Sequence, residues 1–583
     1  MSVDIFTHLN PQQKEAVLYY KGSSIILAGA GSGKTRVLIA KVINLIQNLY
    51  INPKSILMIT FTNKAAGEMK ERIGLRYCLG YIGTFHSFCA RVLRVDGLFV
   101  GLKKNFLIYD EEDQIALIKA VLKKVQLNKK YTPSYFLNRI SAAKNQLIGP
   151  EKYLEVFSDY ASADTATIYQ GYQKELKENN ALDFDDLINV TIRLFTKNKQ
   201  ILDKYQEKYR YILVDEFQDT NYVQYFLTKL LGQKYKNVTV VGDFSQSIYS
   251  WRGAEIRNLE KFKSDFPKTK IFYLEKNYRS SQTILDFAYQ VISKNQTHPI
   301  LSLYTDKKGG EEVIFYEAAT EEDEGIYVAN SISDLKDKYR LDEMAILYRT
   351  NAQSRAIEEV FLHFGIPYVL IGGTRFYERK EIKDVLSYLR LLINPVDKLS
   401  KERTIKLGKT RWEKFKKYYE ENEDSVVKKN TDKIIEEIFQ ATDYLKIYDP
   451  EVEEDYSRLE NIKELKSVAI AFPSLGEFLE QVALVESEYF EGEKNSKNKN
   501  GIRLMTLHQA KGLEFPIVFV VGVEEGILPH SRSMDDLYSL EEERRLFYVG
   551  ITRAKERLYI TYTRQRFIFG TRNYSAKSRF LEE

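Results

Sequence analysis

One stretch of the chain has the residue types and spacing of a phosphate-binding loop: Ala28-Gly29-Ala30-Gly31-Ser32-Gly33-Lys34-Thr35. The apolar run before it predicts a buried strand, and the helical spacing of apolar residues after Arg36 predicts a helix. Glycines between a strand and a helix point backbone N–H groups and the positive helix end at one place, which favours phosphate. Lys34 would then reach the outer phosphates and Thr35 would ligate magnesium. The alternative, a glycine-rich turn without a ligand, is less favoured in this context.

Two adjacent carboxylates end another predicted apolar strand, the run from Tyr211 to Glu216. A phosphate loop needs such a partner: Asp215 would hold magnesium, and Glu216 would polarise the attacking water. Gln246, beyond another predicted strand, could sense the γ-phosphate. The alternative is an acidic strand end without a catalytic role.

Phosphoryl transfer also needs cations, because negative charge on the γ-phosphate must be stabilised in the transition state. Arg279 and Arg553 are the candidates, and both are predicted to lie in a second sheet domain. They would complete the site only when the two domains close on the nucleotide. The alternative is an ordinary pair of surface salt bridges.

Aromatic and polar side chains follow several predicted strands, where the binding edge of an α/β sheet lies. Tyr249, Trp251 and Arg252 offer stacking surfaces beside a cation, and the loop that contains His86 exposes aromatic and hydroxyl groups. Such groups suit single-stranded nucleic acid. Core packing is the alternative for each aromatic residue.

The composition of the chain indicates the general class of protein but does not indicate whether it binds nucleic acid. The chain has 583 residues and a net charge of only +5, so local clusters must carry any nucleic-acid argument. Two cysteines, Cys78 and Cys89, cannot build a four-cysteine metal site. The N-terminus lacks a signal-peptide pattern and no segment has the apolar length of a membrane helix, which predicts a cytoplasmic protein without a membrane partner.

Strand and helix patterns predict an α/β fold with two sheet domains, each interrupted by a mainly helical insertion. The first domain is expected at residues 1–104 and 191–270, and the second at 271–397 and 501–583. The insertions are expected at 105–190 and 398–500.

A longer series of motifs resembles superfamily 1 DNA helicases of the UvrD/Rep/PcrA type. In chain order these are the phosphate loop, TFTNKAA, GTFHSF, VDEFQDTN, GDFSQSIYSWRGA, NYRS, LYRTNAQSR, TLHQAKGLEF and RLFYVGITRA, and with Gln13 they span residues 9–560. The resemblance implies two RecA-like P-loop motor domains, 1A and 2A, with insertions 1B and 2B. It also implies ATP and Mg²⁺ as ligands, and movement along single-stranded DNA, usually 3′ to 5′, with duplex unwinding. The family's loop accepts alanine first, so Ala28 fits.

The resemblance also assigns roles to single residues. Gln13 would read adenine, Tyr278 would stack on it, and Glu514 would contact the ribose side, with Arg36 among the nucleotide-binding residues. Arg279 and Arg553 become arginine fingers. The implied DNA contacts are Phe61, Asn63, His86, Tyr249, Trp251, Arg252, Thr506 and His508, and Phe569 resembles the pin that splits the duplex.

The 2B insertion is shorter than usual in that family, which leaves more than one function open. The first hypothesis is a helicase that unwinds single/double-strand junctions in DNA repair or replication, with repair or replication proteins as partners. The second is a single-strand translocase that displaces bound proteins with little unwinding as a monomer. The third is an ATP-dependent switch that binds nucleic acid without moving; the stacking pair and the two arginines favour a motor over it.

Overall fold

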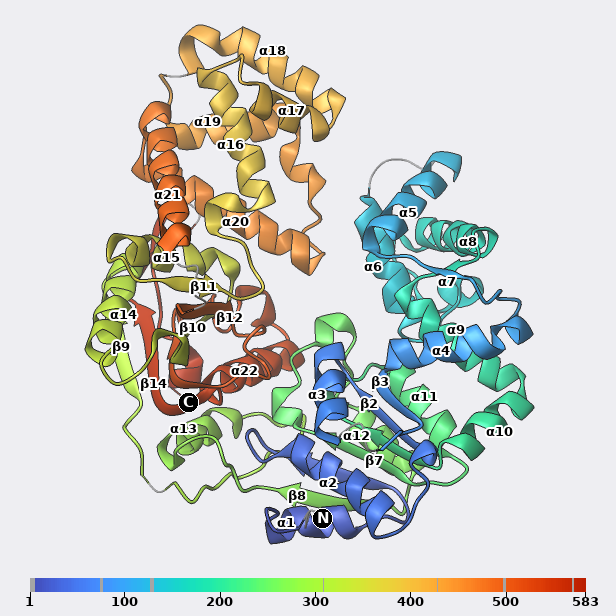
Figure 1. Cartoon of the computed structure of the whole chain (residues 1–583). Helices are drawn as coiled ribbons and strands as arrows, with labels where there is room; N and C mark the ends of the chain where they lie inside the picture. The colour runs from blue at the N-terminus through green and yellow to red at the C-terminus, as the bar shows by residue number, and fades with distance from the viewer. Residues whose placement is uncertain are drawn as a thin grey trace. The chain divides into compact units, whose positions relative to one another are not determined.

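The computed structural model describes residues 6–73, 77–125, 131–307, 309–426, 428–495, 500–568 and 571–582. The chain divides into two compact units. Unit 1 comprises Met1–Arg279 and Gln296–Asp306, and unit 2 comprises Ser280–Asn295 and Lys307–Glu583. Each unit is built on a six-stranded sheet (Figure 1). The predicted α/β class with two sheet domains is confirmed.

All strands of the first sheet run parallel. Their order is β3-β2-β6-β7-β1-β8. Most are nearly continuous apolar runs, as expected where helices cover both faces of a parallel sheet. In sheet order the strands are Tyr81–Thr84, Ile56–Thr60, Tyr211–Val214, Val238–Gly242, Ser24–Ala28 and Lys270–Leu274.

Strand β8 corrects the predicted boundary between the two sheet domains. It pairs with β1 along its length, from Ser24 opposite Lys270 to Ala28 opposite Leu274. The prediction that the second domain begins at residue 271 is therefore wrong. Unit 1 continues through this edge strand to Arg279.

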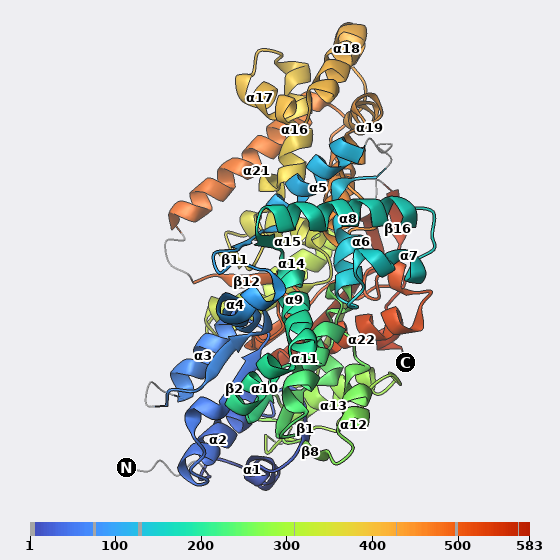
Figure 2. The same cartoon turned by 90° about the vertical axis from the view of Figure 1, so that its right-hand side faces the viewer.

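Helices pack on the first sheet and on one another. Helix α1 begins with a capping box, in which Asn10 and Gln13 each accept a backbone N–H from the other. Helices α9, α10 and α11 lie together (Figure 2). The helices of unit 1 near this sheet are α1 (Pro11–Leu18), α2 (Lys34–Gln47), α3 (Asn63–Ile73), α4 (Phe85–Asp96), α9 (Phe184–Lys197), α10 (Lys199–Lys208), α11 (Tyr222–Gly232) and α12 (Asn258–Asp265).

The first insertion is helical, as predicted, and has its own core around Ile118 and Tyr172. Its helices are α5 (Glu111–Val125), α6 (Pro133–Lys144), α7 (Tyr153–Val156) and α8 (Ser162–Glu178), and a short parallel pair joins its ends, β4 (Leu107–Ile108) with β5 (Ala181–Leu182). The predicted end at residue 190 is too late. Helix α9 already packs Leu187 and Leu194 into the core beside the first sheet.

Unit 2 repeats the plan with the strand order β11-β12-β10-β13-β14-β9. These strands are Tyr368–Leu370, Ile502–Thr506, Met344–Tyr348, Phe515–Val520, Ala554–Thr563 and Ile314–Ala318. Its helices near the sheet are α13 (Gln282–Ile292), α14 (Glu321–Leu335), α15 (Ser354–His363) and α22 (Leu537–Ile551). A hairpin of β15 (Gln565–Ile568) and β16 (Thr571–Tyr574) follows β14.

The second insertion begins earlier than predicted. Phe376 and helix α16 share one apolar core with the helices that follow, so the start at residue 398 cuts through a packed cluster. The helices are α16 (Lys380–Ile393), α17 (Lys398–Lys406), α18 (Lys409–Val426), α19 (Thr431–Thr442), α20 (Glu453–Ala471) and α21 (Leu475–Asn495).

Across the described ranges, no helix by itself combines the length and apolar character needed to cross a membrane. One pair, Glu453–Ala471 with Leu475–Val485, meets that requirement jointly but is bent by 118°. Residues of both helices lie in the apolar core of the second insertion.

Candidate functional site

The predicted phosphate loop connects β1 to α2 in unit 1. Gly31 and Gly33 have φ of +64° and +85°, the left-handed region that glycine adopts without strain. A Cβ at Gly31 would also lie 2.8 Å from the Cβ of Arg279. Gly33 is the N-cap of α2, and no side chain caps it. The helix therefore begins with its N-terminus open to an anion.

Gln13 holds this loop in place. Its Nε2 donates to the Ser32 carbonyl over 2.8 Å, while its Oε1 accepts the Asn10 N–H. These two hydrogen bonds use one N–H and one oxygen lone pair of the Gln13 amide. One N–H and one lone pair remain that could pair with the edge of a base. Its role in adenine recognition stays a prediction. The Ser32 hydroxyl is buried without a hydrogen-bond partner in the described part of the chain, which fits a site that receives a polar ligand.

Asp215 and Glu216 follow β6 and lie close to the loop lysine. Lys34 Nζ is 3.8 Å from Glu216 Oε2. Burial raises the pKa of Asp215 to about 7, and the negative charge of Glu216 adds to the rise. Glu216 has a φ of +51°, which is uncommon for a residue with a side chain and is typical of functional positions. The three predicted residues, Lys34, Asp215 and Glu216, therefore lie close together.

A magnesium ion fits this donor set. Mg²⁺ usually takes one or two carboxylates and completes its shell with phosphate oxygens and water. No group of three or more His, Cys, Asp or Glu residues that could hold a metal occurs in the described ranges. Thr35 and Asp215 stay the predicted ligands.

Gln218, which the sequence did not single out, links the carboxylates to the next strand. Its Nε2 donates to Glu216 Oε2 over 2.6 Å, and its Oε1 accepts the Asp243 N–H over 3.1 Å. Asp243 in turn accepts from Gln246 Nε2 over 2.6 Å. The predicted γ-phosphate sensor is thereby joined to the predicted base through the Gln218 side chain and through the backbone N–H and side chain of Asp243. Gln218 stands in the run VDEFQDTN, which carries part of the family resemblance, but it was given no role of its own.

Replacing Gln218 with alanine is expected to reduce the stimulation of ATP hydrolysis by single-stranded DNA more than it reduces hydrolysis without DNA. The substitution cuts the connection between Glu216 and the segment that leads to Tyr249. The measurement is the ratio of the two ATPase rates. Gln224→Ala is the control, because it removes another buried glutamine, in the α11 capping box. An unchanged ratio in Gln218→Ala would refute the connection.

Tyr278 and Arg279 both belong to unit 1, which corrects the prediction that Arg279 lies in the second domain. The Tyr278 N–H donates to the Gly31 carbonyl over 3.0 Å, so this segment lies directly against the loop. The Tyr278 ring is partly exposed, and the Arg36 guanidinium lies 5.7 Å from its centre. Arg279 is therefore beside the phosphate loop without any movement of unit 2.

The remaining nucleotide candidates lie in unit 2. Arg553 is almost fully buried, and its guanidinium donates to the carbonyls of Val549 and Leu513. Glu514 pairs with Lys555 over 2.8 Å. Their roles toward ATP stay predictions.

The predicted nucleic-acid residues of unit 1 form an aromatic cluster. The rings of Phe61 and Tyr249 stack with centroids 6.0 Å apart and an interplanar angle of 10°. Trp251 meets Tyr249 edge-on at 6.3 Å and is 51% exposed. The Arg252 guanidinium lies 4.5 Å from the Trp251 ring. An exposed tryptophan beside a cation is a suitable platform for a nucleobase.

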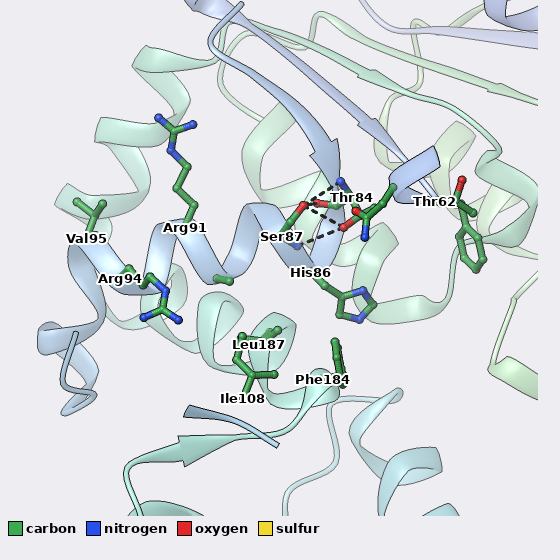
Figure 3. Close-up of a pocket in the computed structure, with 13 residues that line it drawn as sticks. Thr62, Thr84, His86, Ser87, Arg91, Arg94, Val95, Ile108, Phe184 and Leu187 are labelled. Carbon is green, nitrogen blue, oxygen red and sulfur yellow. Dashed lines mark hydrogen bonds between the residues drawn. The ribbon is translucent and has the colours of Figure 1, made fainter. Parts of the chain in front are cut away.

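A pocket of about 750 Å³ opens next to this cluster (Figure 3). Phe61, Asn63 and His86 line it, together with Phe184 at the start of α9. The His86 and Phe184 rings meet edge-on at 5.9 Å, and burial lowers the pKa of His86, which keeps it neutral. Phe184 was missed by the sequence analysis, because nothing local indicates that the end of the insertion returns to α4.

In unit 2, Thr506 ends β12 and is buried, with its hydroxyl accepting the Gln509 N–H. His508 follows it and is partly exposed. The structure does not test their predicted DNA contacts. Phe569, the predicted pin, lies outside the described residues.

Replacing Trp251 with alanine is expected to weaken single-stranded DNA binding by about 5- to 150-fold, since stacking of one base contributes about 1–3 kcal/mol. The loss should also reduce DNA-stimulated ATP hydrolysis. Fluorescence anisotropy with a labelled oligonucleotide measures the affinity. Tyr160→Ala, which removes an exposed aromatic ring from the first insertion, is the control. Equal affinities of Trp251→Ala and wild type would exclude this contact.

Comparison with known proteins covers nearly the whole chain. Residues 9–267 match the UvrD/REP helicase N-terminal domain, and residues 272–565 match the UvrD-like helicase C-terminal domain. ATP-dependent DNA helicase PcrA of Bacillus subtilis (strain 168) is 42% identical over 638 residues, which cover 100% of this chain and 86% of that protein. PcrA of Staphylococcus aureus (strain Mu50) is 42% identical over 635 residues, and PcrA of Staphylococcus epidermidis (strain ATCC 12228) is 43% identical over 632. Each of these matches covers 99% of this chain and 86% of the relative.

Proposed function

Because this chain belongs to the UvrD/REP helicase family, we propose that it is an ATP-dependent DNA helicase that moves 3′ to 5′ on single-stranded DNA and separates duplexes. The relatives named above are ATP-dependent DNA helicases. One observation carries the proposal furthest. Gln218 forms hydrogen bonds to Glu216, the predicted base, and to Asp243. Six residues after Asp243 the chain reaches Tyr249, the predicted stacking residue. Hydrolysis and strand binding thus share one continuous part of unit 1.

The residues of unit 1 have distinct tasks in this proposal. The open N-terminus of α2 and the loop N–H groups bind the phosphates, and Lys34 neutralises the outer ones. Glu216 accepts the proton of the attacking water, and Gln246 reports on the γ-phosphate. Arg279 stabilises the charge that develops on the phosphoryl oxygens.

Magnesium would be held by Thr35 and Asp215, and it would supply positive charge that neutralises the phosphates. A carboxylate ligand binds a metal as the anion, so Asp215 would hold magnesium in its ionised form. A role in DNA repair or replication, with protein partners from those processes, is part of the proposal, and a cytoplasmic location stays a prediction.

The test is strand separation on three matched duplexes, with a 3′ tail, a 5′ tail or blunt ends, with and without ATP. The proposal predicts ATP-dependent separation of the 3′-tailed duplex in preference to the other two. Preference for the 5′ tail would contradict the direction. If no duplex is separated but streptavidin is displaced from a biotinylated single strand, the protein is a translocase.

A further inference from the structure

The pocket beside the aromatic cluster continues along α4, past the residues that the sequence singled out. Arg91, Arg94 and Val95 line this part from α4, and Ile108 of β4 and Leu187 of α9 line it from across the pocket (Figure 3). We call this part the α4 pocket. It is continuous with Phe61 and His86, because one cavity contains both sets of residues.

The α4 pocket has positive charge without a neutralising carboxylate. Within the ranges that the structure describes, neither Arg91 nor Arg94 forms an ion pair, and both are exposed. Arg94 lies 4.6 Å from the centre of the Phe106 ring, and its Nη1 donates to the Lys104 carbonyl. These contacts hold the guanidinium over the surface while leaving its charge uncompensated.

One further cation, Lys208, lies near Arg91, whereas Lys204 is paired with Asp96 over 2.8 Å. The pKa of Lys208 is lowered, first by burial and then by the positive charges of Arg91 and Lys204. A guanidinium-rich surface at the end of a cavity favours an anionic ligand.

The opposite lining is apolar and accessible. Val95 is 54% exposed, Phe184 is 50% exposed and Ile108 is 37% exposed. A ligand that contacts both the arginines of α4 and the apolar residues opposite them needs an apolar face and a negative charge close together. A nucleotide has this combination, with a base for the apolar side and a phosphate for the arginines.

We propose that the α4 pocket binds a further nucleotide of the single strand, adjacent to those held at Phe61 and His86, with Arg94 and Arg91 contacting its phosphates. The inference rests on the proposed DNA binding and extends it by naming a new part of the strand path. An acidic peptide with apolar side chains is the competing ligand, and continuity with the aromatic cluster favours DNA.

The first test measures how DNA affinity depends on salt. Arg94→Ala and Arg91→Ala are compared with wild type and with Arg72→Ala, which removes an exposed arginine from α3 outside the pocket. For single strands the slope of log K against log salt changes by about 0.7 for each phosphate contact. In a variant that combines Arg91→Ala with Arg94→Ala, the slope of log K against log salt should fall by more than about one unit. Arg72→Ala should keep the wild-type slope.

The second test locates the strand. Ile108→Cys is made in a Cys78→Ser background, since Cys78 is exposed and Cys89 is buried. Oligonucleotides carrying a thiol tether at successive positions are then tested for disulfide formation. We expect adducts at one or two adjacent positions only, and Val95→Cys should react at the same positions.

Two results overturn the inference: wild-type slopes in the arginine variants, or Ile108→Cys adducts at no position while the oligonucleotide is bound. Capture of an acidic peptide by the pocket, with DNA binding unaffected, would overturn it as well. If the wild-type protein binds no single-stranded DNA at all, the proposed function itself fails, and this outcome is separate because it needs no variant.

Discussion

Replacing Glu216 with glutamine is expected to lower the rate of ATP hydrolysis by about 10²–10⁴-fold, the usual contribution of a general base. The substitution removes the proton acceptor while keeping the size of the side chain. The new amide oxygen still accepts from Gln218 Nε2, which lies 2.6 Å from Glu216 Oε2 in the wild type. Affinities for ATP and for single-stranded DNA should therefore stay within a few fold of wild type.

Steady-state hydrolysis and nucleotide binding are measured on the same preparation of Glu216→Gln. Glu68→Gln is the control, because it removes an exposed carboxylate from α3. Hydrolysis at the wild-type rate by Glu216→Gln would remove this residue as the base. A loss of ATP binding as large as the loss of turnover would show instead that Glu216 acts mainly in positioning Lys34.

Replacing Lys34 with alanine is expected to lower ATP turnover by about 10²–10³-fold, comparable to removing one preorganised donor to developing charge. Lys34 is largely buried and lies 3.8 Å from Glu216, so its loss also leaves two neighbouring carboxylates without this cation. Affinity for ATP should fall too, because Lys34 binds the phosphates in the ground state.

The aromatic cluster serves as the internal control for Lys34→Ala. Trp251 and Tyr249 do not depend on the lysine, so binding of single-stranded DNA without nucleotide should be retained. Isothermal titration with ATP and anisotropy with DNA separate the two effects. Normal ATP affinity with normal turnover would contradict the assignment of the loop.

Much of the fold follows from local pattern. Alternating strand and helix signals locate both parallel sheets, and Asn10 before Pro11 gives the start of α1. The partner of a strand is not a local property, and for this reason β8 was assigned to the wrong sheet. Helix α9 has the same difficulty: its sequence looks helical whether it belongs to the insertion or, as observed, to the core around Leu187.

Three residues predicted for the nucleotide site lie close together in the structure, while their roles toward ATP stay predictions. Lys34, Asp215 and Glu216 meet as expected. Gln218 was missed because its function comes from two hydrogen bonds to segments far apart in the sequence. Arg279 was placed in the wrong unit for the same reason as β8, which directly precedes it.

Two residues predicted for the nucleotide site, Arg553 and Glu514, belong to unit 2. Arg553 and Glu514 have the residue types that a nucleotide site needs, but their contacts are with their own unit. They stay predictions until their variants are measured.

We propose that the ATP site and the aromatic cluster of unit 1 are coupled, and one measurement tests this coupling most directly. ATP hydrolysis is followed in the presence and absence of a saturating single-stranded oligonucleotide, with wild type and Trp251→Ala side by side. If the two sites are coupled, DNA should stimulate hydrolysis by the wild type at least about tenfold, which corresponds to about 1.4 kcal/mol, and clearly less in Trp251→Ala. Hydrolysis by the wild type at the same rate with and without bound DNA would contradict it.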